Sequence, residues 1–233
     1  MIYITGDTHG DFSRFYRFCD TAETTTKDVM VVLGDAGLNY FGDNRDTQRK
    51  RAVSQFPITF LCIHGNHEMR PTDISSYKEK IFCGGFVYYE EDFPNILFAK
   101  DGEIYRLDKL DCVVIGGAYS VDKFYRLNYG YRWFENEQPS DEIRRQVEQK
   151  LTERKNETDI VLSHTCPLKY EPVEVFIGGI DQSTVDKSTE QWLDAVEDKI
   201  SYRKWYCGHY HTEKTIDRMQ FMFEGIVELN SGG

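Results

Sequence analysis

The sequence predicts an α/β fold in which a parallel or mixed β-sheet is covered by helices. Short apolar runs alternate with longer polar segments whose apolar residues recur at helical spacing, and this alternation is typical of helix-covered sheets. The chain has 233 residues, 40% of them hydrophobic, which is enough for one sizeable domain and short for two independent ones. The sequence contains no repeat, linker or low-complexity segment, so we expect a single domain over residues 1–233.

The first third of the chain shows the alternation most clearly. An apolar strand is predicted near the first residue, and the next segment carries apolar residues at helical spacing. A second apolar run precedes a highly charged helix candidate, and a third apolar run follows that candidate. The predicted strands are residues 2–5, 29–33 and 58–63, and the predicted helices are residues 12–20 and 44–55.

The pattern changes in the middle of the chain. Residues 86–115 read as short strands separated by turn signals such as Asp101-Gly102, which predicts an antiparallel meander. The clearest amphipathic helix is predicted over residues 140–153, because Ser140 is a typical N-cap residue. Beyond it we expect strands over residues 160–163 and 205–207, a helix over residues 189–199, and a closing hairpin over residues 214–229 around Arg218.

The composition restricts the possible partners. The formal net charge is −11, so the surface repels long polyanions and stable nucleic-acid binding is not expected. A small anionic substrate remains compatible with this charge if the site is locally positive. The sequence shows neither a signal peptide nor an apolar run long enough to span a membrane, which favours a cytoplasmic protein without a membrane partner. The six cysteines are scattered and are expected to be reduced, partly buried thiols.

Side chains that can bind metals follow five of the predicted strands. In an open α/β sheet the carboxyl ends of the strands form the ligand-binding edge, so we expect these side chains to meet on one rim. A single Gly-Asp pair or a lone histidine is usually a turn or an ordinary structural residue, but the repeated placement favours a common site. The candidates are Asp7 and His9, Asp35, Asn66 and His67, His164, and His209 and His211.

The types of these side chains indicate the kind of metal. They are carboxylates, imidazoles and an amide, without a thiolate, and this mixture suits Mn²⁺, Fe or Zn²⁺ in a site of nitrogen and oxygen donors. His67 is set aside because the adjacent Asn66 already supplies a ligand from that turn. Seven candidate ligands remain, which are too many for one ion and natural for two. His64 lies outside this set, and we predict a structural or supporting role for it.

In this order the motifs resemble those of calcineurin-like metallophosphoesterases. The family pattern is DxH, GD, GNH(D/E), a lone His and GHxH, and all five blocks are present over nearly the whole chain. The resemblance implies a four-layer α/β/β/α sandwich of two mixed sheets flanked by helices. It also implies two divalent metal ions, most simply Mn²⁺. By this resemblance Asp7, His9 and His211 hold one ion, Asn66, His164 and His209 hold the other, and Asp35 bridges them.

Two of the blocks depart from those of the Ser/Thr protein phosphatases. Those enzymes continue the second block as GDxVDRG, whereas this chain has Leu38 in place of the acid that orients the catalytic histidine. Asn39 stands where those enzymes have a phosphate-binding arginine, and His64 stands where they have a second one. A protein phosphatase that resembles calcineurin itself is therefore not expected.

The resemblance also implies a mechanism. Two divalent ions would form hydroxide from water, and that hydroxide would attack phosphorus in line with the leaving group. His67 is predicted to be the catalytic side chain, either as general acid to the leaving oxygen or as hydrogen-bond donor to the phosphoryl group. Glu68 either orients His67 or caps the next segment.

Residues 116–134 are the candidate substrate-binding segment, because they also follow an apolar strand and should emerge on the same rim. The segment combines cationic and aromatic side chains, which can bind a phosphate and stack on a ring. Tyr119 and Arg126 are the first candidates. The alternative is a loop whose aromatic side chains pack on the sheet.

The sequence therefore predicts hydrolysis of a small phosphate mono- or diester, nucleotides included, by hydroxide formed between two metal ions. Two alternatives stay open. One is a phosphoprotein phosphatase with an atypical phosphate-binding arrangement, and the other is a non-catalytic scaffold that binds metal. The oligomeric state is not predicted.

Overall fold

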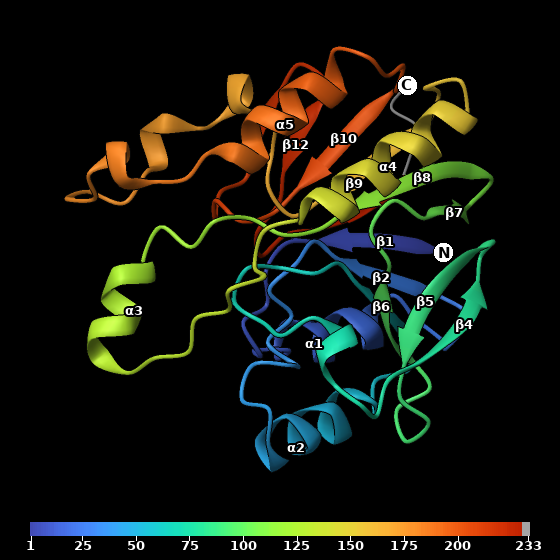
Figure 1. Ribbon diagram of the computed structural model, residues 1–233. Coiled ribbons are helices and arrows are strands. Elements are labelled where there is room, and N and C mark those ends of the chain that lie inside the picture. Colours follow the sequence, from blue (N-terminus) through green and yellow to red (C-terminus); the bar gives the residue numbers. More distant parts are fainter. Residues whose placement is uncertain (230–233) are drawn as a thin grey trace.

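The computed structural model describes residues 1–229, and Figure 1 shows two β-sheets packed face to face with helices on their outer faces. The first sheet contains seven strands in the order β13-β1-β2-β3-β6-β5-β4. Its four central strands are mutually parallel, and the strands at both edges are antiparallel. The strands are Ile2–Thr5 (β1), Val29–Val32 (β2), Thr59–Cys62 (β3), Lys78–Phe82 (β4), Gly85–Tyr89 (β5), Ile96–Ala99 (β6) and Ile226–Glu228 (β13).

The second sheet contains six strands in the order β11-β12-β10-β9-β8-β7. Strands β12, β10, β9 and β8 run parallel, and β11 and β7 are antiparallel edge strands. Both sheets are therefore mixed. The strands are Ile104–Leu107 (β7), Leu110–Ile115 (β8), Ile160–Ser163 (β9), Lys204–Cys207 (β10), Lys214–Ile216 (β11) and Met219–Phe221 (β12).

The molecule has three hydrophobic layers between its four structural layers. Leu61 of β3 and Leu162 of β9 belong to the core between the two sheets. Helices α1 (Arg14–Thr21) and α2 (Asn44–Val53) cover the outer face of the first sheet. Helices α4 (Asp141–Glu153) and α5 (Ser188–Glu197) cover the outer face of the second. The central strands are buried on both faces, as continuous apolar runs require, and the predicted four-layer α/β/β/α sandwich is confirmed.

The predicted helices are present with small shifts at their ends. Ser140 caps α4 as expected, because its side-chain oxygen accepts a hydrogen bond from the backbone N–H of Ile143 at 3.3 Å. Helix α1 begins two residues later than the sequence indicated, and α2 ends two residues earlier. Helix α5 covers residues 188–197 rather than 189–199.

The predicted meander over residues 86–115 is wrong. Strands β5 and β6 form one antiparallel hairpin in the first sheet, whereas β7 and β8 form another in the second sheet. The chain crosses between the sheets after β6, because β6 pairs with β3 and β8 pairs with β9. Strand β4 is a charged edge strand with little burial, and the sequence did not predict it.

The prediction of a closing hairpin over residues 214–229 is correct for its first part only. Strands β11 and β12 pair around Asp217 and Arg218, and Asp217 adopts a positive φ of 52° in the turn. Strand β13 then leaves this hairpin and pairs with β1 of the other sheet, which joins the last described strand to the first.

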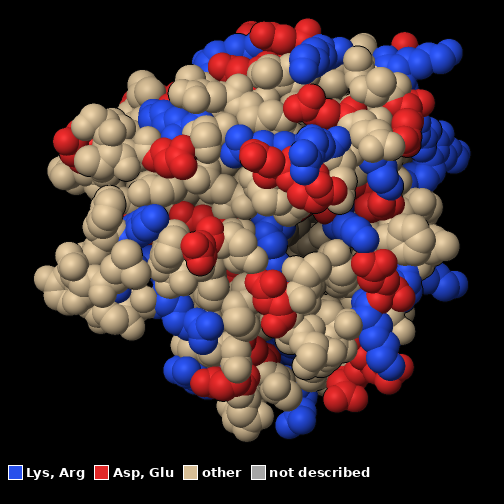
Figure 2. Space-filling view, viewed as in Figure 1, with Lys and Arg blue, Asp and Glu red and all other residues tan. Residues whose placement is uncertain are grey.

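Residues 116–134 are buried at their two ends, where Ala118, Tyr119 and Phe134 pack inside the protein, but not in between. They include the short helix α3 (Lys123–Tyr129), none of whose residues is buried, and α3 projects from the side of the molecule in Figure 1. Phe124, Tyr125 and Leu127 are each more than half exposed, and Figure 2 shows that this projection has a mostly uncharged surface.

The cysteines and the lengths of the helices bear on the expectations drawn from composition. All six cysteines are free and five of them are buried. Within residues 1–229, no helix is both long enough and apolar enough to cross a membrane. The predicted domain of residues 1–233 ends four residues beyond the described part of the chain.

Candidate metal centre and adjoining cavities

The seven predicted metal ligands come from five strand ends in both sheets, and the structure brings them together at one edge. Asp7 and His9 follow β1, Asp35 follows β2 and Asn66 follows β3 in the first sheet. The other three follow β9 and β10 of the second sheet, namely His164, His209 and His211. The carboxyl ends of the parallel strands of both sheets thus share one rim, as the sequence predicted.

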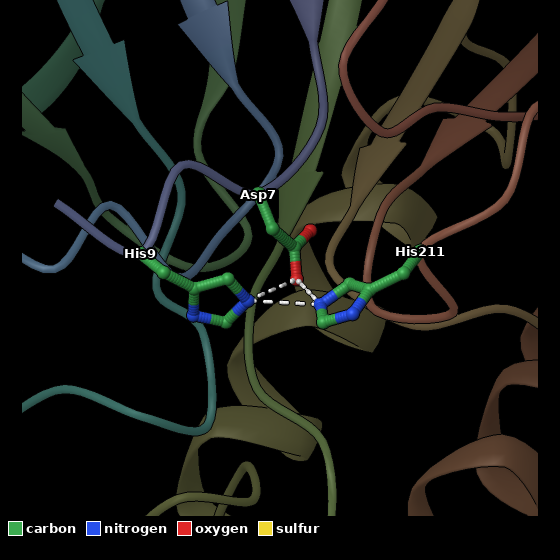
Figure 3. A group of neighbouring side chains, drawn as sticks. All are labelled: Asp7, His9 and His211. Atoms are coloured by element: carbon green, nitrogen blue, oxygen red, sulfur yellow. Dashed lines mark hydrogen bonds and ion pairs between the residues drawn. The ribbon is translucent and has the colours of Figure 1, made fainter. Parts of the chain in front are cut away.

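Asp7, His9 and His211 form the first group (Figure 3). The Oδ2 atom of Asp7 lies 3.3 Å from His211 Nε2 and 3.7 Å from His9 Nε2, and the two ring nitrogens are 2.8 Å apart. The buried Oδ2 of Asp7 has no hydrogen-bond partner within residues 1–229. A buried carboxylate oxygen without a partner is costly, and a cation bound between these three atoms would stabilise it.

Asn66, His164 and His209 form the second group. Asn66 Oδ1 lies 2.8 Å from His164 Nε2 and 3.1 Å from His209 Nδ1. The other nitrogen of His164, Nδ1, lies 2.7 Å from the backbone carbonyl oxygen of Leu33 and therefore carries a proton. In neutral His164 the Nε2 atom is consequently an acceptor that faces another acceptor. This contact is stable only with a proton or a metal cation between the two atoms.

The orientation of Asn66 follows from a buried network that the sequence analysis missed. The amide Nδ2 of Asn66 donates to Ser120 Oγ at 2.9 Å, and Ser120 Oγ donates to Glu137 Oε2 at 2.5 Å. Glu137 also accepts from the backbone N–H of Ser120 at 3.0 Å. Since Ser120 uses its proton on Glu137, it accepts from Asn66, and the Oδ1 atom of Asn66 must face the two histidines.

Asp35 lies between the two groups. Its Oδ2 atom is 3.8 Å from His9 Nδ1, and its Oδ1 atom is 3.9 Å from His164 Nε2. The backbone N–H of His67 donates to Oδ1 at 2.8 Å and fixes the carboxylate. A carboxylate that faces both groups fits the bridging role that the resemblance implies.

The backbone at this rim is strained where the ligands lie. His9, Asp35, His209 and His211 all have positive φ angles, between 47° and 68°. Such angles are uncommon for non-glycine residues and concentrate at functional sites. The neighbouring glycine Gly65 is required for a different reason, since a Cβ atom there would lie 2.0 Å from Asp35 Oδ1.

The pKa shifts of three ligands favour the forms that bind a cation, whereas the Asp7 carboxylate raises the pKa of His211. Burial, reinforced by His164, lowers the pKa of His209 to about 3, so its imidazole is neutral and able to bind a cation. Burial alone would raise the pKa of Asp7 and Asp35, but the surrounding imidazoles outweigh it and lower both pKa values. Both carboxyls are therefore ionised, and the donor set fits divalent cations.

The residues at the positions that depart from the protein-phosphatase pattern are buried and line neither of the two cavities described below. Leu38 and Asn39 are fully buried, and Asn39 Oδ1 accepts a hydrogen bond from the Tyr77 hydroxyl at 3.0 Å. His64 is 3% exposed and does not reach the cavities beside the metal centre, so its role is structural. Glu68 Oε1 accepts from the backbone N–H of Gly65 at 3.1 Å, and no hydrogen bond joins Glu68 to His67 within residues 1–229. Glu68 therefore supports the turn instead of orienting His67.

His67 and Arg126 lie side by side next to the metal ligands. A guanidinium nitrogen of Arg126 is 3.3 Å from His67 Nε2, and the Nε atom of Arg126 donates to Asp122 at 2.8 Å. His67 Nε2 is 4.0 Å from Asp35 Oδ2. The structure thus places His67 and Arg126 together at the candidate metal centre, although they are 59 residues apart in sequence.

Two cavities meet at this pair. The larger, of about 380 Å³, is lined by His67 and Arg126, by Tyr119 and by the segment between β9 and α5. The smaller cavity, of about 340 Å³, is lined by residues that include Arg49, Tyr40 and Tyr131. Four residues line both cavities, namely His9, His67, Asp122 and Arg126.

Glu190 on the wall of the larger cavity is a second residue that the sequence analysis missed. It is 4% exposed, and its Oε1 atom accepts a hydrogen bond from Thr165 Oγ1 at 2.8 Å. Its Oε2 atom has no hydrogen-bond partner within residues 1–229. Burial raises the pKa of Glu190 to about 7, despite the opposing hydrogen bond from Thr165.

Glu190→Gln should stabilise the metal-free protein at alkaline pH. The Glu190 carboxyl keeps its proton to about pH 7 when folded but loses it near pH 4.5 when unfolded, so it destabilises the fold as pH rises through this window. Above pH 7 the variant should gain on the order of 3 kcal/mol in free energy of unfolding, and below pH 4.5 the gain should vanish. Urea unfolding with chelator at both ends of this window measures the difference. Glu153→Gln, at an exposed position near the end of α4, is the control. Equal free energies of unfolding for Glu190→Gln and wild type at alkaline pH would contradict the prediction.

One family model matches most of the chain. A family model described as calcineurin-like phosphoesterase matches residues 1–213, a range that includes all seven candidate ligands. A search of curated proteins gave no match. Among solved structures, the chain is similar to the crystal structure of TT1561 of Thermus thermophilus, with a TM-score of 0.48 and 14% identity over 89% of this chain and 80% of that chain. The chain belongs to the calcineurin-like phosphoesterase family.

Proposed function

We propose that the protein hydrolyses small phosphate mono- or diesters with the help of two divalent metal ions. Family membership supports a metal-dependent phosphoesterase in general. The observation that carries the proposal is the pair of acceptor groups, Asn66 Oδ1 and His164 Nε2, which face each other at 2.8 Å next to an unpartnered carboxylate oxygen of Asp7.

The two groups described above would each hold one ion, with Asp35 between them. Two divalent ions, when bound, polarise the phosphoryl oxygens and activate a water nucleophile. Mn²⁺ is the first candidate and Fe or Zn²⁺ the next, because the donors are imidazoles, carboxylates and an amide. Within the set only Asp7 and Asp35 carry negative charge, so two divalent ions would leave a positive site in an acidic protein.

His67 and Arg126 act on the substrate in this proposal. His67 donates a hydrogen bond or a proton from its ring to the leaving oxygen or to the phosphoryl group. Arg126, held by Asp122, binds a non-bridging phosphoryl oxygen. It would replace the phosphate-binding arginines whose positions Asn39 and His64 occupy, and it comes from a different segment of the chain.

The direct test is phosphate release from p-nitrophenyl phosphate and bis(p-nitrophenyl) phosphate. The protein is stripped with chelator and reloaded separately with Mn²⁺, Zn²⁺, Fe²⁺ or Mg²⁺, and the bound metal is counted. We expect two ions per chain and hydrolysis that the chelator abolishes. A protein that binds two ions and hydrolyses neither ester, nor any nucleotide, sugar phosphate or phosphopeptide, would be the non-catalytic scaffold.

Arg126→Gln should weaken phosphate binding. Loss of a charge-assisted hydrogen bond should raise KM, and the inhibition constant of inorganic phosphate, by about ten- to a hundredfold, with a smaller effect on kcat. Steady-state kinetics with phosphate as competitive inhibitor would measure both constants. Arg145→Gln, on the exposed face of α4, is the matched control. Unchanged constants in Arg126→Gln would exclude Arg126 from phosphate binding.

A further inference from the structure

The wall of the larger cavity is chemically divided. One part is the metal centre with His67 and Arg126, and another part is apolar. The apolar part comes from the segment between β9 and α5, which projects from the same side of the molecule as α3 in Figure 1. The cavity volume of about 380 Å³ is in the range of small-molecule sites. The apolar side chains are Val175, Phe176, Ile177, Ile180 and Val185.

The charge of the apolar part disfavours an anionic ligand. Lys187 lies there, but its ammonium group pairs with Glu171 at 2.7 Å, so the two charges cancel. Glu190 remains, buried and with one carboxylate oxygen unused. A second phosphate or a carboxylate would meet this oxygen unfavourably. Above a pH of about 7, where Glu190 is ionised, a hydrogen-bond donor would satisfy this oxygen, because an ionised carboxylate only accepts.

Tyr210 connects Glu190 with the metal centre. It lies between the candidate ligands His209 and His211, and its ring is nearly parallel to that of Phe176, with 13° between the planes and 6.3 Å between the centroids. Its hydroxyl lies 3.1 Å from Thr165 Oγ1, which in turn donates to Glu190. The wall between the candidate metal centre and Glu190 is therefore aromatic, and it suits a planar group.

We propose that Glu190 determines specificity by accepting an N–H hydrogen bond from a planar heterocyclic leaving group. The phosphoryl group lies at the metal centre, the heterocycle lies along Tyr210 and Phe176, and the donor reaches Oε2 of Glu190 while Thr165 holds Oε1. This inference rests on the proposed phosphoesterase function and names its class of substrate. Retention of an unpaired buried carboxylate, which destabilises the fold at alkaline pH, is typical of a binding site.

The test uses substrates that differ in N–H donors on the same purine. Guanosine, inosine and purine riboside 5′-monophosphates offer an amino group with a ring N–H, a ring N–H alone, and no donor. We expect kcat/KM of the metal-loaded protein to fall about ten- to a hundredfold from the guanosine to the purine riboside ester. Binding of the three free nucleosides, measured by calorimetry, should follow the same order. Glu190→Gln should reduce both ratios toward one, and the control Glu153→Gln, exposed on α4, should retain them.

The outcomes separate the two proposals. Wild-type protein that hydrolyses the nitrophenyl esters but treats the three purine esters alike would overturn the role of Glu190 and leave the phosphoesterase intact. Equal ratios in wild type and in Glu190→Gln would overturn it too. Should no ester be hydrolysed, the proposed function fails, and the order of nucleoside binding alone decides whether Glu190 recognises a donor. The wild-type series remains decisive even if Glu190→Gln does not fold.

Discussion

Asp35→Asn should remove at least one of the two metal ions and lower kcat/KM by about a thousandfold. The substitution keeps the shape of the side chain but removes the charge that faces both groups of ligands, at 3.8 Å from His9 and 3.9 Å from His164. Asparagine tolerates positive φ, so the backbone angle of 47° at this position is not the cause of the loss. Metal counting and steady-state hydrolysis of p-nitrophenyl phosphate would measure the two effects.

Asp108→Asn provides a matched control for this substitution. Asp108 also has a positive φ, of 44°, but it lies exposed in the turn between β7 and β8. This control should keep two ions and full activity. Asp35→Asn that still binds two ions and retains wild-type kcat/KM would show that the carboxylate does not bridge a catalytic metal pair.

His67→Gln should lower kcat by about a hundred- to ten-thousandfold while both metal ions stay bound. His67 contacts Arg126 and faces the larger cavity, whereas the second group of ligands is completed by its neighbour Asn66. Loss of activity without loss of metal would therefore separate a residue that acts on the substrate from one that binds an ion.

The leaving group distinguishes the two roles that remain for His67. A general acid matters most for a poor leaving group, so the loss should be larger for phenyl phosphate than for p-nitrophenyl phosphate. An equal loss for both esters would assign His67 to the phosphoryl oxygens instead. His64→Gln is the control for the loss of an imidazole, because His64 is buried outside the site, and the folded fraction should keep its kcat. Unchanged kcat in His67→Gln would remove His67 from the mechanism.

Much of the fold could be predicted from local signals. Apolar runs and helical spacing located the strands that carry the candidate ligands and four of the helices, since these periodicities reflect which faces are buried. The pairing partners of the strands could not be predicted in this way. Strands β6 and β7 are close in sequence yet lie in different sheets. Strand β6 pairs with β3 of the first sheet, whereas β7 pairs with β8, which pairs with β9 of the second.

Residue types and their positions after strands were sufficient to predict the seven candidate ligands and their metal preference. Each of these residues closely follows a strand, and the chemistry of a donor is a property of its residue type. The three-dimensional packing was needed to see that Asn66 faces His164 across 98 positions of sequence and that Ser120 and Glu137 fix its amide. The packing also brings Arg126 to His67 and buries Glu190 with a free oxygen. Burial and hydrogen bonding between distant segments depend on how two sheets pack, and no local pattern records that packing.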